Sequence, residues 1–182
     1  GWTEQDPDMW WLSTQKAVSA VIDRVRKLPN NVEICAVGLS GQMHSSVFLD
    51  KHGKVIRPAL LWNDMRTTVQ CTEITDKLGI SGLMRTGGNL ALEGFTAPKL
   101  LWLRQNEPNN YDCLSTLLLA KDYVRYRLTG EIATELSDAA GTMLLDIRNL
   151  CWSVEVLQTL SLSNEILPPI VGSTEISGQV TK

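Results

Sequence analysis

Short apolar segments of strand length alternate along this chain with longer segments whose apolar residues recur at helical spacing. The run 32–39 is apolar and rich in β-branched residues, and 117–119 is a block of leucines; each has the length of a buried strand. Helices are expected over 7–28, 66–78, 96–105, 121–128 and 153–160. This alternation predicts an α/β fold, in which helices cover a sheet.

Capping residues and glycines mark the ends of several expected helices. Asp6 can accept hydrogen bonds from free amides of a helix that begins at Pro7, where proline is tolerated. Gly79 and Gly130 follow two other helices and are expected to close them. Asp50–Gly53 is a hairpin signal between two apolar runs. Further strands are expected over 59–62 and 143–147, and loops over 86–89 and 137–142.

Composition excludes several classes of protein. Of the 182 residues, 43% are hydrophobic and 20% are charged, which is a soluble globular balance. The net charge of −3 argues against a nucleic-acid binder, and no apolar run approaches the roughly 18 residues of a membrane span. The four cysteines are scattered without a CxxC pair, so we expect neither a zinc cluster nor a redox dithiol. This cysteine usage indicates a reducing, cytoplasmic compartment, with Cys35 as a small core residue.

The first candidate site follows the run 32–39. Ligands of open α/β sheets bind beyond the carboxyl ends of strands. There Gln42 and His44 offer an amide and an imidazole for hydroxyls or carbonyls, and Met43 offers an adaptable apolar contact. Spacing alone favours the simpler interpretation, a plain turn with a partly buried histidine. The stretch also nearly matches the G-x-S-x-G elbow of serine hydrolases, but Gln42 stands at its last glycine, and both histidines of the chain lie too close after Ser40.

A second candidate site is the stretch 62–66. Asn63, Asp64 and Arg66 could hydrogen-bond a polyhydroxylated ligand, and Trp62 could stack on the C–H face of a sugar. The alternative is a helix cap formed by Asn63 or Asp64, which the sequence alone favours. The chain has no glycine-rich phosphate-binding motif, and its two histidines are poorly spaced for a metal, so we expect no metal or nucleotide site in it.

A series of ordered motifs resembles the FGGY family of carbohydrate kinases, and within it the xylulokinase branch. The motifs are WTEQDP followed by WW at 2–11, GLSGQMH at 38–44, LWNDMR at 61–66, GFTAPKLLW at 94–102 and SDAAGT at 137–142. The resemblance spans nearly the whole chain, and the series is specific where any single motif would be weak.

The resemblance implies a fold and an activity. The fold is the ribonuclease H-like, actin-like ATPase fold, with residues 1–182 as an N-terminal, sugar-binding domain truncated at both ends, lacking its first strands and the C-terminal lobe. The activity is transfer of the γ-phosphoryl group of ATP to D-xylulose, giving D-xylulose 5-phosphate. The remaining alternatives are a family kinase for ribulose or gluconate and a non-catalytic sugar-binding module.

The resemblance also assigns residues. Met43 and His44 take the place of the sugar-contacting pair, with Gln42, Asn63 and Asp64 as further substrate-binding candidates. It places the catalytic aspartate C-terminal to this chain, so no catalytic, cofactor-binding or metal-binding residue is expected here, and ATP and Mg²⁺ serve only the full-length parent.

Four further expectations follow from the resemblance. Lys99 and Trp102 are read as structural, the lysine as a cap or a snorkelling side chain. The chain alone is expected to be inactive. An open sheet edge is expected to permit self-association or a homodimer. The expected binding partner of the chain is a small sugar, and neither a nucleic acid nor a membrane is expected.

Overall fold

A four-stranded antiparallel sheet lies at the centre of the computed structural model, which describes residues 1–29 and 32–181. Its strand order is β1-β3-β2-β4, with the registers Gln5↔Ala59, Ser46↔Leu60 and Val47↔Leu118. The strands are β1 (Glu4–Gln5), β2 (Ser46–Leu49), β3 (Ala59–Leu60) and β4 (Thr116–Leu119). Two smaller pairs are formed by β5 (Thr134–Glu135) with β8 (Ile170–Val171) and by β6 (Leu145–Asp146) with β7 (Cys151–Trp152).

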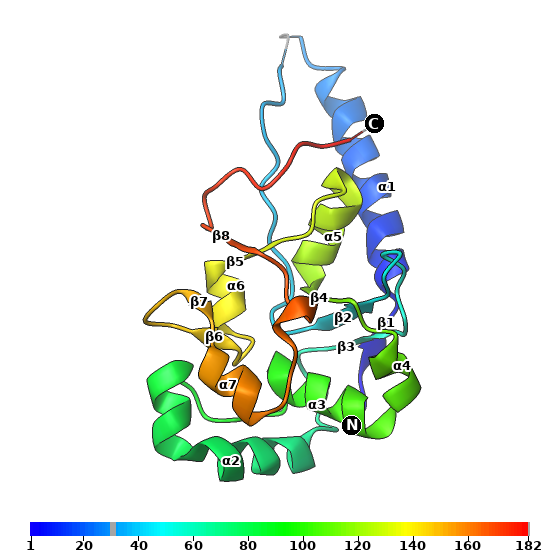
Figure 1. Cartoon of the computed structure of the whole chain (residues 1–182). Coiled ribbons are helices and arrows are strands. Elements are labelled where there is room, and N and C mark those ends of the chain that lie inside the picture. Colours follow the sequence, from blue (N-terminus) through cyan, green and yellow to red (C-terminus); the bar gives the residue numbers. More distant parts are fainter. Residues whose placement is uncertain (30–31, 182) are drawn as a thin grey trace.

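Helices cover both faces of this sheet, as the alternating pattern predicts. Figure 1 shows α2, α3 and α7 on one side of the sheet and α1 and α5 on the other. The helices are α1 (Pro7–Val25), α2 (Thr68–Thr86), α3 (Thr96–Asn106), α4 (Pro108–Asp112), α5 (Ala120–Thr129), α6 (Leu136–Ala140) and α7 (Val154–Thr159), followed by the 3₁₀ turn η1 (Asn164–Ile166).

Successive side chains of the central strands enter different cores. Phe48 and Leu117 pack in the core under α2, α3 and α7, whereas Val47 and Leu118 pack in the core toward α5 and the start of α1. Side chains alternate between the two faces of a strand, so burial on both faces requires the continuous apolar runs seen in the sequence. The strand expected over 117–119 and the hairpin at 50–53 are confirmed, whereas the strand expected over 59–62 is shortened to β3 at Ala59–Leu60.

Local signals placed most helix ends correctly. The Asp6 side chain accepts a hydrogen bond from the Asp8 amide at 2.9 Å, and Gly130 closes α5 in the left-handed conformation at φ 77°. Gly79 interrupts α2 at φ 66°, but helical structure resumes and ends only at Thr86, so the expectation that the helix stops at 78 is only partly right.

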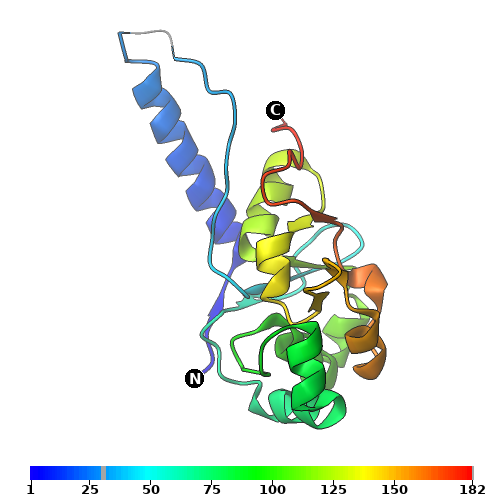
Figure 2. The ribbon, with the colours of Figure 1, turned by 90° about the vertical axis from the view of Figure 1, so that its left-hand side faces the viewer.

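The run 32–39 is the main error of the sequence-based prediction. It is not a buried strand but an extended, exposed segment, and Cys35 is exposed rather than in the core. A strand needs neighbouring backbone to satisfy its hydrogen-bonding groups, and among the described residues no strand pairs with this segment. Figure 2 shows the segment running beside the outer part of α1, where Val18 and Val21 are likewise exposed.

The region 137–147 also differs from expectation. The predicted loop 137–142 contains most of the short helix α6, because the Glu135 carboxylate accepts hydrogen bonds from the amides of Ser137 and Asp138 and so caps a helix there. The strand expected over 143–147 is reduced to β6. Among the helices described, none is long and apolar enough to cross a membrane.

Candidate functional site

The segment 42–45 links the exposed extended run to β2 and meets the end of β3. The Ser45 hydroxyl, which is fully buried, donates a hydrogen bond to Gln42 Oε1 at 3.0 Å and accepts one from the Trp62 amide at 3.1 Å. One hydroxyl therefore joins the two candidate sites that the sequence indicated. The structure thus brings Gln42, Met43 and His44 together with the stretch that contains Asn63 and Asp64.

The backbone of His44 is held in an uncommon conformation. Its φ of 59° lies in the left-handed region, which non-glycine residues rarely adopt. Its carbonyl oxygen accepts hydrogen bonds from Lys99 Nζ at 3.0 Å and from Thr96 Oγ1 at 3.3 Å, both from the start of α3. Such a conformation persists where surrounding contacts determine it, and strained residues of this kind cluster at functional sites.

The His44 imidazole is confined on two sides. Its ring meets Phe95 edge-on, with 4.8 Å between centroids, and it lies against Gly141, where an added Cβ would come within 2.4 Å of the His44 Cε1 atom. Nδ1 is buried and has no hydrogen-bond partner. Burial, followed by the charge of Lys99, lowers the pKa of His44, which favours the neutral ring. A neutral imidazole can donate from one nitrogen and accept at the other.

The neighbouring candidate residues are more open to solvent. The Met43 side chain is exposed, as are Trp62 and Asn63. Gln42 is half-buried, and its Nε2 donates to Gln5 Oε1 at 3.2 Å. An exposed apolar surface beside amide groups and a neutral imidazole suits an uncharged polyhydroxylated ligand.

Asp64 lies behind this surface, with 0% of it exposed. Its carboxylate accepts from the Thr3 amide at 2.5 Å, from the Arg66 amide at 3.0 Å and from Arg66 Nε and Nη2 at 2.8 Å each. Burial by itself opposes ionisation of this carboxyl, but the hydrogen bonds from Arg66 and Thr3 outweigh it and lower the pKa. The structure therefore gives Asp64 a set of internal partners and no exposed oxygen.

Arg66 completes an internal cluster that sequence reasoning missed. Its guanidinium carbon lies 4.1 Å from the Trp2 ring centroid and 4.7 Å from that of Trp102, and Nη1 is 2.7 Å from Glu4 Oε1. Arginine stacks on aromatic faces and pairs bidentately with carboxylates, so it suits this position. The signal was available, because Trp2 and Glu4 belong to the first motif of the series and Trp102 to the fourth.

Lys99 is the other buried cation next to the site. It is 0% exposed and donates to the carbonyl oxygens of His44 and of Gly94, the latter at 2.6 Å. Burial lowers the pKa of Lys99 to about 7. The sequence suggested that Lys99 caps a helix or snorkels to solvent, and it does neither. Trp102 packs in the core as expected.

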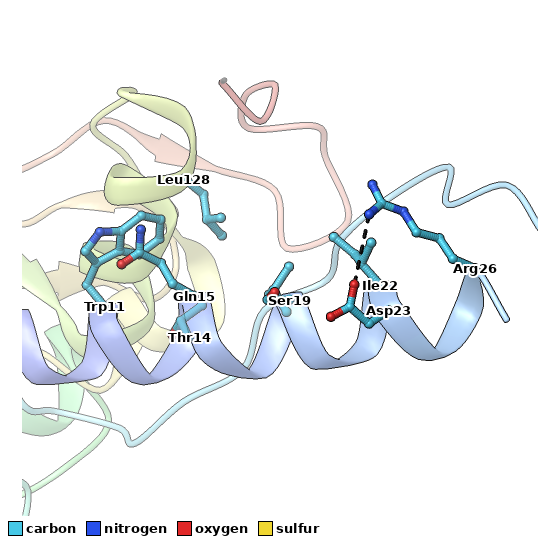
Figure 3. Close-up of a pocket in the computed structure, with 9 residues that line it drawn as sticks. Trp11, Thr14, Gln15, Ser19, Ile22, Asp23, Arg26 and Leu128 are labelled. Carbon is cyan, nitrogen blue, oxygen red and sulfur yellow. Dashed lines mark ion pairs between the residues drawn. The ribbon is translucent and has the colours of Figure 1, made fainter.

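A shallow cavity of about 330 Å³ lies elsewhere, between α1 and Leu128 at the end of α5 (Figure 3). Its wall carries Trp11 and Ile22, and the exposed pair formed by Asp23 and Arg26 lies at one end. None of the candidate residues at 42–44 or 63–64 lines it, so it adds nothing to the site at the start of β2.

Comparison with known proteins shows the family. The sequence profile of the FGGY family of carbohydrate kinases, N-terminal domain, matches residues 1–182. The chain belongs to the FGGY family of carbohydrate kinases. The xylulose kinase of Lactococcus lactis is 43% identical over 99% of this chain, and that of Escherichia coli K12 is 42% identical over 97%; in each case the match covers 35% of the relative. The FGGY chain thus spans about a third of the length of these relatives.

Solved structures agree with the fold of this FGGY domain. A crystal structure described as a xyloylose kinase from Brucella ovis superimposes with a TM-score of 0.90 at 36% identity, covering 99% of this chain and 36% of the other. The gluconate kinase of Lactobacillus acidophilus superimposes with a TM-score of 0.88 at 25% identity, with the same coverage. The predicted fold class, an α/β domain of the actin-like ATPase fold, is confirmed.

ATP and Mg²⁺ are implied by the family, and each would need suitably placed side chains in the part of the chain that the structure describes. Among residues 1–29 and 32–181, no group of three or more His, Cys, Asp or Glu side chains is arranged to hold a metal ion. The buried cations Lys99 and Arg66 already have protein partners. We therefore assign none of the described residues to ATP or Mg²⁺.

Proposed function

We propose that this chain is the sugar-binding part of an ATP-dependent kinase that phosphorylates D-xylulose to D-xylulose 5-phosphate. In that reaction a sugar hydroxyl oxygen attacks the γ-phosphorus, the bond to ADP breaks, and a base takes the hydroxyl proton. The role of this domain is to hold the sugar in position for that step. No described residue is assigned as the base.

The observation that carries the proposal is the confined, neutral imidazole of His44 beside the exposed Met43. The half-buried ring can exchange hydrogen bonds with ketose hydroxyls from its accessible side, while its buried Nδ1 lies against Gly141. Met43 supplies apolar contact. Gln42 and Asn63 are proposed to line the same surface, and Asp64 to support it from behind through Arg66. The relatives named xylulose kinase agree with this choice of sugar.

The site's electrostatics disfavour gluconate as the substrate. A carboxylate ligand calls for an accessible cation, but Lys99 and Arg66 have no exposed side chain. Lys121, which lies against Gly41, is already paired with Asp122, Glu135 and Asp138. Ribulose remains as an alternative ketose, since a neutral imidazole does not by itself select stereochemistry. A non-catalytic sugar-binding module would bind sugar without releasing ADP.

The test is an ADP-release assay on the full-length protein that the gene encodes, with D-xylulose, D-ribulose, gluconate and glycerol as substrates. We expect D-xylulose to give the highest kcat/KM. His44→Ala should lower that value by about 10–100-fold, because it removes hydrogen bonds to the substrate. The matched control is His52→Ala, since His52 is the other histidine and lies exposed in the hairpin turn. Equal effects of the two substitutions would contradict the proposed site.

Three accompanying proposals concern the chain itself. The 182-residue chain alone should release no ADP with D-xylulose and Mg-ATP. It should self-associate through exposed backbone, which light scattering across a concentration series would measure. All four cysteines are free thiols, which supports a reducing, cytoplasmic location.

A further inference from the structure

Lys99 connects two segments that border the proposed sugar site. Its ammonium donates to the carbonyl oxygen of His44 at 3.0 Å and to that of Gly94 at 2.6 Å. The first carbonyl belongs to the segment before β2, and the second to the loop before α3. One side chain therefore holds the two segments at a fixed separation.

The burial of this lysine needs an explanation, because lysine is almost never fully buried unless it is paired. Lys99 has 0% exposure, and no carboxylate among the described residues forms an ion pair with it. Its partners are carbonyl dipoles, which compensate a buried charge only in part. A methionine would fill similar space without this penalty, so packing alone does not account for a lysine here.

The hydrogen bond from Lys99 acts on a residue whose backbone is strained. His44 is held at φ 59°, and its carbonyl receives a second hydrogen bond, from Thr96, and a third, from Ser46 Oγ at 3.4 Å. The direction of the carbonyl fixes the orientation of the peptide unit, and the backbone in turn restricts the rotamers of the side chain. Phe95 and Gly141 then confine the imidazole that results.

We propose that Lys99 is a positioning residue for sugar binding, which sets the direction of the His44 imidazole by tying the His44 carbonyl to the start of α3. The inference rests on the proposed role of His44 as a sugar contact. In its charged form Lys99 also favours the neutral form of the ring, since burial and then the charge of Lys99 lower the pKa of His44. Lys99 itself touches no exposed surface and is not a catalytic residue.

The first test is spectroscopic and needs no sugar. In the full-length protein labelled with ¹³C-histidine, the imidazole signals of His44 and His52, the two histidines of this chain, are those that disappear in His44→Ala and in His52→Asn. In the full-length protein, Lys99→Met should shift the His44 signal and raise its titration midpoint, while His52 stays unchanged. Lys77→Met is the matched control, because Lys77 is an exposed lysine paired with Glu73 on α2. An unchanged His44 signal in Lys99→Met would overturn the proposal.

The second test is a double-mutant cycle on kcat/KM for D-xylulose. Lys99→Met should lower kcat/KM by about 10–100-fold, mostly through KM, since misplacing a contact by about 1 Å can cost that much. In a His44→Ala background, Lys99→Met should lower kcat/KM by less than about threefold. Equal losses in both backgrounds would show that Lys99 acts independently of His44 and would refute the proposal.

Two variants separate the positioning role of Lys99 from a failure to fold and from the proposed role of His44. If Lys99→Met fails to fold, Thr96→Val removes only the second donor to the His44 carbonyl and should produce the same shift and a smaller loss. If Thr96→Val also leaves the His44 signal in place, the proposal is wrong. If His44→Ala costs nothing in turnover, the proposed function of His44 fails, while the histidine signals still decide whether Lys99 positions the ring.

Discussion

Asp64→Asn is the substitution that most directly tests the internal cluster behind the site. The carboxylate is 0% exposed and accepts four hydrogen bonds, one from Thr3 and three from Arg66. Asparagine has nearly the same shape but only one acceptor oxygen, and its amide group donates. Whichever way the asparagine amide is turned, its NH₂ group faces N–H donors of Thr3 or Arg66.

The magnitude follows from that count. With each carboxylate oxygen accepting two hydrogen bonds, the amide leaves two donors unsatisfied, at about 1–3 kcal/mol each. The sum agrees with the roughly 3–5 kcal/mol typical of breaking a buried ion pair by removing one partner. Against a total stability of about 5–15 kcal/mol, this is a large fraction. At about 1–3 kcal/mol per molar urea, a loss of about 3 kcal/mol lowers the unfolding midpoint by about 1–3 M.

The assay is urea unfolding of the 182-residue chain followed by far-UV circular dichroism. The matched control is Asp23→Asn on α1. The Asp23 side chain is 63% exposed, and its Oδ1 lies 4.0 Å from Arg26 Nη1. An exposed pair of this kind contributes about 0–1 kcal/mol, so the control should barely move the midpoint. If Asp64→Asn lowers the urea unfolding midpoint no more than Asp23→Asn does, the reasoning is refuted.

The same pair of proteins gives a pH test. The pKa of Asp64 is lowered from 3.8, because hydrogen bonds from Arg66 and Thr3 outweigh burial, which opposes ionisation. Stability from a group with a depressed pKa is present above its unfolded pKa and is lost as pH falls through the folded pKa. The stability difference between wild type and Asp64→Asn should therefore be largest near pH 7 and shrink below about pH 4. A difference that stays constant down to pH 3 would contradict the assignment.

Three further outcomes follow from the structure. Gly141→Ala should raise KM for D-xylulose about tenfold or more in the ADP-release assay, because its Cβ would lie 2.4 Å from His44 Cε1 and must displace the ring. Gly130→Ala should destabilise the chain by about 1–2 kcal/mol in urea, since position 130 has φ 77°. A thiol reagent should leave Cys71 unmodified until unfolding, because burial raises its pKa to about 11, while mass spectrometry finds rapid modification of the exposed Cys35, Cys113 and Cys151.

Gly82→Ala is the control for both glycine substitutions. Gly82→Ala in α2 meets only ordinary contacts, the nearest at 3.7 Å, and should leave KM unchanged. It should also leave stability equal or higher, whereas Gly130→Ala lowers it. Modification of all four cysteines in the native chain would contradict the burial of Cys71.

Features that depend on neighbours along the chain could be predicted from the residues alone. The Asp6 cap of α1 and the Gly130 end of α5 each involve atoms within a few residues, so local chemistry is enough to predict them. The leucines at 117–119 are apolar on both faces and could only be a buried segment. The ordered motifs predicted the family, which the comparisons confirm, and they are the basis for proposing Met43 and His44 as sugar contacts.

How residues distant in sequence are combined could be seen only in the folded chain. The run 32–39 has the composition of a strand, but pairing depends on backbone elsewhere, and no described strand lies against it. Asp64 and Asn63 are adjacent in sequence, yet one is buried against Thr3, 61 residues away, and the other is exposed. The hydrogen bond from Lys99 to His44 spans 55 residues. Contacts at such separations depend on how the chain folds back on itself, which local propensity does not encode.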